Sequence, residues 1–262
     1  MDKTLLGMNA KKKEEKVKEL YEKWPYPSRE IASKKDLSKY LKWISAIFTT
    51  DENFWKEKKV LDAGCGTGEL ANALALGGAS VLGIDFSSAA IKKAKKLAQR
   101  TQSGAKFKEK NILNFKIKKK FDVVIALGSL HHTTNAEKGF QICASHLNKE
   151  GLIILGLYNK YSRTRLRAKR IVLFALCGSQ IEKRIELGKK LFGGPKNNYW
   201  AADKYGQVHE SYHTINEVLR WFEKNEIDFV SSKPKFEHPV IDELKWLAKK
   251  ENAFFVMIGR KN

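Results

Sequence analysis

Three glycines stand at alternate positions directly after a short apolar run that ends in an acid. The stretch from residue 60 to 68 reads VLDAGCGTG, with glycine at positions 64, 66 and 68. Glycine has no Cβ, so such a run permits a sharp turn and lets backbone amides approach a ligand closely. On this reasoning, a side chain at Gly64 or Gly66 would occupy the ligand's space. The stretch predicts a turn between a strand and a helix that holds a nucleotide-type cofactor.

A second apolar run ends in an acid about 20 residues beyond the first glycine. Residues 80–85 read SVLGID, so Asp85 stands at the end of a predicted strand. A carboxylate at that position can accept hydrogen bonds from both hydroxyls of a ribose. The glycine spacing is not the G-x-G-x-x-G of dinucleotide-binding proteins. An acid nevertheless suits any unphosphorylated ribose, so NAD, and with it an oxidoreductase, remains an alternative.

Two adjacent histidines follow another apolar run. Residues 121–133 read FDVVIALGSLHHT, which places His131 and His132 in the loop after a predicted strand. Histidine titrates near neutral pH, so one of them could take a proton from a hydroxyl group or an acidic carbon. The structural alternative is that they cap or pack the start of the following helix.

Together these segments resemble the class I S-adenosylmethionine (SAM) dependent methyltransferases. The first motif of that family, hydrophobic-hydrophobic-Asp-x-Gly-x-Gly-x-Gly, matches residues 60–68. The resemblance covers residues 59–157 well, and the C-terminal helices and strands by pattern only. It implies SAM as methyl donor and S-adenosylhomocysteine (SAH) as product. It also implies that the last strand of the sheet runs antiparallel to the others.

The resemblance assigns cofactor contacts to individual residues. It places Asp62 near the methionine end of SAM, where orienting the glycine loop is the alternative role. It places Phe86 against the adenine face, with Asn111 and Ile112 beside adenine. The family usually has an acid where Asn111 stands, yet an Asn side-chain oxygen can still accept a hydrogen bond from the adenine amine. The expected cofactor-binding residues are Asp62, Gly64, Cys65, Gly66, Gly68, Asp85, Phe86, Asn111, Ile112 and Leu127.

The loop Leu130-His131-His132 narrows the class of acceptor. Methylases of exocyclic base amines carry an (Asp/Asn/Ser)-Pro-Pro-aromatic motif at this point, and this chain has none. The loop instead resembles that of small-molecule methyltransferases, including quinone- and sterol-type enzymes, in which it faces the methyl donor. We therefore expect His131 or His132 to be the catalytic base for in-line transfer to an oxygen, carbon or nitrogen atom. Because a sulfonium is an excellent leaving group, alignment in a dry pocket could also suffice without a base.

The elements that must position these residues alternate between strand and helix. Hydrophobic periodicity predicts two helices, near residues 11–24 and 36–47, before the sheet. The later alternation implies right-handed crossovers and a parallel sheet covered on both faces. The predicted fold is therefore α/β, a Rossmann-like, seven-stranded, mostly parallel sheet. Its first strand is expected to end near residue 62, and the other six to span 80–85, 105–110, 121–127, 152–157, 228–232 and 253–259. Helices are expected at 67–76, 88–99, 136–147, 215–223 and 240–250.

The chain is expected to hold one catalytic domain with two additions. Residues 1–50 would form an N-terminal helical extension or lid, and residues 51–262 the methyltransferase domain. No strand is predicted between about 159 and 212, so this segment is interpreted as a helical insertion of two helices and a loop after the fifth strand. The prolines and aromatic rings of residues 24–27 would either fold over the cofactor mouth or form a simple linker.

Polar and aromatic residues of both additions are candidate substrate contacts. In the insertion, Asp203, His209 and Glu210 are potential metal ligands, but their spacing matches no metal-binding motif, so no metal is expected. The candidate substrate contacts are Tyr26, Arg29, Tyr158, Asn159, His209 and Tyr212.

The formal charge of +21 on 262 residues is the one compositional extreme. It favours acidic partners such as nucleic acid, anionic lipid or a phosphorylated substrate. RNA is thus the main alternative acceptor, although the lysines are scattered along the chain. A non-enzymatic nucleic-acid-binding module is a further alternative. The basic residues 163–170 run into an apolar segment, which would dock on anionic lipid, bind a phosphate or pack within the domain.

Several absences bear on location. No run approaches the roughly 18 to 20 apolar residues that a membrane span needs, and the first residues lead into no apolar signal region. Three widely spaced cysteines, Cys65, Cys143 and Cys177, suit a reducing compartment. The sequence therefore predicts a cytoplasmic small-molecule methyltransferase without a membrane span, and it indicates no particular oligomeric state.

Overall fold

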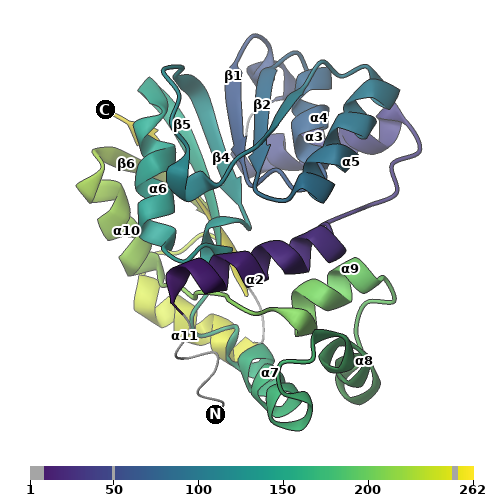
Figure 1. The fold of residues 1–262 in the computed structure, drawn as a ribbon. Coiled ribbons are helices and arrows are strands. Elements are labelled where there is room, and N and C mark those ends of the chain that lie inside the picture. The colour runs from purple at the N-terminus through teal and green to yellow at the C-terminus, as the bar shows by residue number, and fades with distance from the viewer. Residues whose placement is uncertain (1–8, 49–50, 250–252) are drawn as a thin grey trace.

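A seven-stranded sheet forms the centre of the molecule (Figure 1). The computed structural model describes residues 9–48, 51–249 and 253–262. The strand order is β3-β2-β1-β4-β5-β7-β6, and β7 runs antiparallel to both of its neighbours. The predicted fold class and the antiparallel last strand are therefore confirmed. The strands are β1 (Lys59–Ala63), β2 (Ser80–Asp85), β3 (Lys106–Glu109), β4 (Phe121–Leu127), β5 (Leu147–Tyr158), β6 (Ile227–Lys233) and β7 (Phe254–Lys261).

Helices cover both faces of the sheet, as its apolar strands require. On one face lie α3 (Lys34–Phe48), α4 (Glu69–Leu76) and α5 (Ser88–Thr101). Buried side chains such as Leu37 and Leu74 form the core on that side. The other face holds α6 (Ala136–Ser145), α10 (Ile215–Lys224) and α11 (Pro239–Lys249), with the stacked rings of Phe140 and Phe222 in their core.

Most element boundaries lie within two residues of the prediction, and two of the differences have a local reason. Helix α4 begins at Glu69, two residues after the predicted start, because Gly68 has a φ of +83° and is not helical. Strand β5 begins at Leu147, five residues before the predicted Leu152. Its extra residues continue the pairing with β4 across a register irregularity between Phe121 and Val123.

The N-terminal helix α2 (Ala10–Lys23) crosses the edge at which the parallel strands end (Figure 1). Its Lys18 pairs with Glu109 at the end of β3, with 2.8 Å between Nζ and Oε1. Its Glu22 accepts hydrogen bonds from the backbone N–H of Ser88 and Ala89 and so caps α5. These contacts place α2 over the ends of β2 and β3.

The segment between β5 and α10 leaves the sheet and returns to it at one place. Asn159 and His213 form an isolated bridge, and His213 N donates to the Tyr158 carbonyl at 2.9 Å. The segment holds α7 (Thr164–Cys177), α8 (Ile181–Phe192), the short α9 (Asn198–Ala201) and a π-helical turn, η4 (Ala202–Gly206). Two helices were predicted here, whereas α9 and η4 were not. Among the described residues, no helix has the length and apolar character to cross a bilayer.

Candidate functional site

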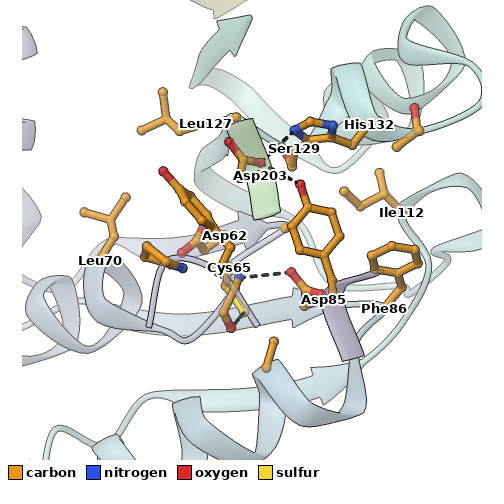
Figure 2. A pocket seen from close by; sticks show the side chains of 18 of the residues that line it. Asp62, Cys65, Leu70, Asp85, Phe86, Ile112, Leu127, Ser129, His132 and Asp203 are labelled. Atoms are coloured by element: carbon orange, nitrogen blue, oxygen red, sulfur yellow. Dashed lines mark hydrogen bonds and ion pairs between the residues drawn. The ribbon is translucent and has the colours of Figure 1, made fainter. Parts of the chain in front are cut away.

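A cavity of about 500 Å³ lies at the carboxyl ends of the strands, between the sheet, α2 and the insertion (Figure 2). Open α/β sheets bind their ligands at this edge, because the helix N-termini and the loops converge there. The sheet contributes Asp62, Asp85 and Leu127 to the cavity wall, and η4 contributes Asp203.

The glycine loop is shaped mainly by other parts of the protein. Gly64 and Gly66 both have a positive φ, at +86° and +52°. A Cβ at Gly64 would collide with the Ser129 side chain, and one at Gly66 with the Tyr26 carbonyl oxygen. A Cβ at either position would thus meet protein atoms first, although both glycines line the cavity.

The segment that holds Tyr26 lies directly on the glycine loop. Thr67 N donates to the Tyr26 carbonyl at 3.2 Å, and Ser28 N donates to Thr67 Oγ1 at 2.9 Å. Tyr26 and Pro27 also line the cavity. Of the two interpretations of this segment, a cover at the cofactor mouth fits these contacts better than a simple linker.

Asp85 is held by backbone donors at the end of β2. Its Oδ2 accepts from Gly66 N at 3.0 Å and its Oδ1 from Ser87 N at 2.9 Å. Burial nevertheless raises the pKa of Asp85 to about 6. The carboxylate is thus fixed in orientation and faces the cavity (Figure 2).

Asp62 is a second buried carboxyl group in the same cavity. Burial, and then the negative charges of Asp85 and Glu69, raise the pKa of Asp62 to about 7. Among the described residues, no Lys, Arg or His forms an ion pair with Asp62 or Asp85. A buried, uncompensated carboxylate is costly, and a bound cation would offset that cost.

A third carboxyl group reaches the cavity from α2. Glu14 Oε1 accepts from Thr134 Oγ1 at 2.7 Å, and Glu14 Oε2 accepts from Asn111 Nδ2 at 3.1 Å. The Asn111 oxygen accepts from Leu113 N at 2.9 Å, so it caps the short helix η2 (Ile112–Asn114). The oxygen that the sequence assigned to the adenine amine thus already has a partner, and Glu14 places a further acceptor beside it.

His132 faces the cavity from the short helix η3 (Leu130–His132). Its Nδ1 lies 3.3 Å from the His209 carbonyl oxygen, and its Nε2 lies 3.8 Å from Asp203 Oδ1 (Figure 2). A carbonyl only accepts, so Nδ1 carries the proton and Nε2 presents a lone pair. Burial lowers the pKa of His132, and the negative charge of Asp203 opposes that shift. The ring is therefore suited to accept a proton at Nε2.

His131 is placed differently from His132. Its side chain is 0% exposed and is not among the described residues that line the cavity. The ring lies 4.0 Å from the Tyr158 ring, centroid to centroid, and neither nitrogen has a hydrogen-bond partner in the described part of the chain. Of the two histidines, only His132 can reach a ligand in the cavity.

A buried network holds Asp203 in the cavity wall. Arg170 donates through Nη2 to the Asp203 carbonyl at 2.9 Å and through Nε to the Lys204 carbonyl at 2.8 Å. Glu210 pairs with Arg170 at 2.9 Å. The Asp203 carboxylate then accepts from the Tyr21 hydroxyl at 3.0 Å. Helix α7 thus fixes the π-helical turn that carries this acid.

The other candidate residues divide between the cavity and its surroundings. Nine of the ten predicted cofactor residues line the cavity, and the exception is Gly68. Gly68 packs closely against α5 instead, since a Cβ there would lie 2.6 Å from the Ala94 Cβ. The predicted substrate residues Tyr26, Arg29 and Tyr158 also line it.

Three predicted substrate contacts lie outside the cavity. Asn159 is buried and donates to Glu243 Oε1 at 2.6 Å. His209 Nε2 lies 3.0 Å from the Thr133 carbonyl, and the Tyr212 hydroxyl accepts from Arg170 Nη1 at 3.3 Å. Each of these side chains thus has a partner within the protein. Glu210, a potential metal ligand, pairs with two arginines, and the described residues contain no cluster suited to a metal ion.

Sequence reasoning missed several residues of the cavity wall. Helix α2 supplies Glu14 and Tyr21, and α3 supplies Tyr40 and Trp43. Glu14 and Tyr21 stand seven residues apart on a predicted helix, so they share one face. That spacing predicts that the two side chains point the same way, but it does not predict where the helix packs.

The chain matches the family model described as "Methyltransferase domain" over residues 55–230. A ubiquinone biosynthesis O-methyltransferase of Actinobacillus pleuropneumoniae is 31% identical over 109 residues, which cover 39% of this chain and 47% of that protein. A protein of the same name from Coxiella burnetii is 32% identical over 106 residues, covering 40% of this chain and 45% of that protein. The chain thus spans about half the length of these curated relatives.

Solved structures of low identity share the fold. Magnesium protoporphyrin IX methyltransferase from Synechocystis PCC 6803 with bound SAM has a TM-score of 0.53 and 16% identity, covering 87% of this chain and 79% of that one. PKMT2 from Rickettsia typhi in complex with SAH has a TM-score of 0.63 and 15% identity, covering 85% of this chain and 52% of that one. The family match and the sheet confirm the prediction of a class I SAM-dependent methyltransferase domain, and the chain belongs to the methyltransferase domain family.

Proposed function

We propose that this protein transfers the methyl group of SAM in line to an oxygen, carbon or nitrogen atom of a small molecule. The observation that carries the proposal is the pair of buried acids, Asp62 and Asp85, which face one cavity without a cationic partner among the described residues. SAM carries a sulfonium and an ammonium group, and their positive charge complements these acids. When bound, SAM supplies an electrophilic methyl group.

The cavity offers a fitting contact for each part of the cofactor. Asp85 would bind the ribose hydroxyls, and Asp62 the methionine end. Phe86 and Ile112, on the same side of the cavity as Asp85 in Figure 2, would pack against adenine. Glu14 would accept from the adenine amine, because a carboxylate is a stronger acceptor than the amide oxygen of Asn111 beside it.

The remaining wall defines the class of acceptor. Tyr26, Trp43, Tyr158 and Phe254 line the cavity with aromatic surface. Such surface favours a planar, largely apolar acceptor. His132 Nε2 would take the acceptor's proton, and Asp203 would stabilise the resulting positive charge. The two O-methyltransferases named for ubiquinone biosynthesis are relatives whose name is consistent with an acceptor of this kind.

Transfer of radiolabelled methyl groups to fractionated cell extract tests the proposal. We expect label in the organic-soluble, low-molecular-weight fraction, unchanged by nuclease treatment. His132→Ala should lower the rate by on the order of 100-fold if Nε2 is the base, with SAH binding retained. Label only in nuclease-sensitive material would favour the RNA alternative, and no transfer to any fraction would contradict the proposal.

A further inference from the structure

Helix α7 presents an apolar face to solvent. Ile171, Val172 and Leu176 are 61%, 45% and 63% exposed. They lie within two turns of one helix at spacings of one, four and five residues, together with the exposed Ala168 and Ala175. These positions form one contiguous stripe, and we call Ile171, Val172 and Leu176 the α7 face.

The α7 face is not the side by which the helix packs in its own domain. Leu173, on the opposite side, is fully buried against α8, where a Cβ on Gly188 would lie 3.0 Å from its Cδ1. Phe174 lies 5.8 Å from the guanidinium of Arg184. An ordinary surface helix buries one apolar side and exposes a polar one. From Ile171 to Cys177, helix α7 is apolar on both sides.

The charge around the α7 face is strongly positive. Residues 160–196 contain eleven Lys or Arg and only two Glu. Arg165 is exposed in the first turn of α7, and Lys183 and Lys190 are exposed on α8, beside the exposed Leu191. Of the two acids, Glu182 pairs with Lys23. An apolar stripe on α7, with exposed basic side chains on α7 and on the neighbouring α8, complements a surface that combines acyl chains with anionic headgroups.

A second exposed apolar group, on α11, lacks this charge. Val240, Ile241 and Leu244 are 51%, 52% and 49% exposed, close to the values on the α7 face. Residues 237–249 contain three acids and only two lysines. The two helices therefore match in exposed apolar side chains and differ in charge.

We propose that the α7 face docks this protein on an anionic lipid surface. The aliphatic side chains would enter the boundary between headgroups and acyl chains, while Arg165, Lys183 and Lys190 would pair with lipid phosphates. Helices α7 and α8 lie at an end of the molecule away from the sheet, as Figure 1 shows, so the sheet does not block their approach to a bilayer. The docking is independent of the proposed reaction, but the insertion that carries the α7 face also carries Asp203 into the cavity.

Co-sedimentation with vesicles tests this proposal. The full chain should bind vesicles of phosphatidylglycerol and phosphatidylcholine at least tenfold more tightly than vesicles of phosphatidylcholine alone. The triple variant Ile171→Gln, Val172→Gln, Leu176→Gln should lose at least tenfold in affinity for the anionic vesicles. A variant with Arg165→Gln, Lys183→Gln and Lys190→Gln should lose most of the preference for anionic lipid.

The matched control is Val240→Gln, Ile241→Gln, Leu244→Gln, which removes as much exposed apolar surface and should bind anionic vesicles as the wild type does. Unchanged thermal unfolding and SAH binding would show that each variant is folded. Equal binding to both kinds of vesicle, or equal losses in the α7 and α11 variants, would overturn the proposal. So would a dimeric wild type that becomes monomeric in the α7 variant, because a second copy of the chain would then cover the face.

Discussion

At the scale of single residues, the site is defined by carboxyl groups that the fold buries without neutralising. Asp62 lies one residue before the end of β1 and Asp85 ends the neighbouring β2, and Gly83 of β2 pairs with Asp62. Burial raises the pKa of both groups. The free protein therefore stores an electrostatic cost at the place where a cationic ligand can offset it.

The raised pKa of Asp62 makes stability depend on pH. In the folded protein its pKa is about 7, against 3.8 in the unfolded chain. Between these values only the folded state keeps the proton, so this group's contribution to stability is lost as pH rises toward 7. From pH 5 to pH 8, the wild type should lose about 2 to 3 kcal/mol more of its free energy of unfolding than Asp62→Asn does. Urea unfolding of both proteins at the two pH values measures this difference, and equal losses would show that Asp62 is ionised throughout.

Asp85 should contribute directly to cofactor affinity. Asp85→Asn should weaken SAH binding by about 1 to 3 kcal/mol, because charged hydrogen bonds to the ribose are lost. The matched control is Asp122→Asn at the start of β4, which also accepts a backbone N–H, from Lys59 at 2.8 Å, but lies outside the cavity lining. Calorimetry should show a loss for the first variant and none for the second. Equal affinities would remove the ribose assignment.

Glu14 should accept a hydrogen bond from the exocyclic amine of adenine. S-inosylhomocysteine carries a carbonyl oxygen in place of that amine, and it would face the Glu14 carboxylate with no proton to donate. The wild type should bind SAH about 10-fold or more tightly than the inosine analogue, since a charged acceptor would lose its donor. Glu14→Ala should bind the two compounds with similar affinity. Undiminished preference for SAH in that variant would assign the amine contact elsewhere.

At the scale of elements, the N-terminal segment and the glycine loop form one unit. Gly66→Ala should detach the segment at residues 25–28, because the new methyl group collides with the Tyr26 carbonyl. We expect weaker SAH binding. We also expect faster amide exchange at Thr67, because its N–H donates a hydrogen bond to the Tyr26 carbonyl. Gly104→Ala is the matched control, since Gly104 also has a positive φ, of +78°, but nothing lies within 4 Å of a Cβ there. Similar effects of the two substitutions would attribute the loss to backbone strain alone.

The elements could be predicted from the sequence because each is encoded locally. Apolar runs encode the strands, and the spacing of Thr214 and Glu217 encodes the capping box that begins α10. The placement of α2 could not be predicted, because it depends on contacts between residues far apart in the chain. Glu14 meets Asn111, and Tyr21 meets Asp203.

The different roles of the two histidines could not be predicted from the sequence for the same reason. The sequence treats His131 and His132 alike, since both stand in one loop. Only the packing of Tyr158 against the first ring, and of Asp203 beside the second, distinguishes them. Asp203 was noted for its chemistry as a metal ligand, whereas its position near His132 comes from Arg170, which holds the π-helical turn.

At the scale of the whole molecule, strong positive charge surrounds an acid-lined cavity. The formal charge is +21, yet five carboxyl groups, Glu14, Asp62, Glu69, Asp85 and Asp203, line the one cavity described above. The acids attract a cationic cofactor inside, while the outer surface suits an anionic partner such as lipid. The charge of the surface and the chemistry of the cavity thus serve different partners.

Calorimetric titration of the wild-type protein with SAM, SAH and NAD tests the central claim most directly. The buried acids predict that SAM and SAH each bind at one site, that Asp62→Asn and Asp85→Asn weaken both, and that NAD fails to compete. Absence of binding by both SAM and SAH, or displacement of SAH by NAD, would contradict the account.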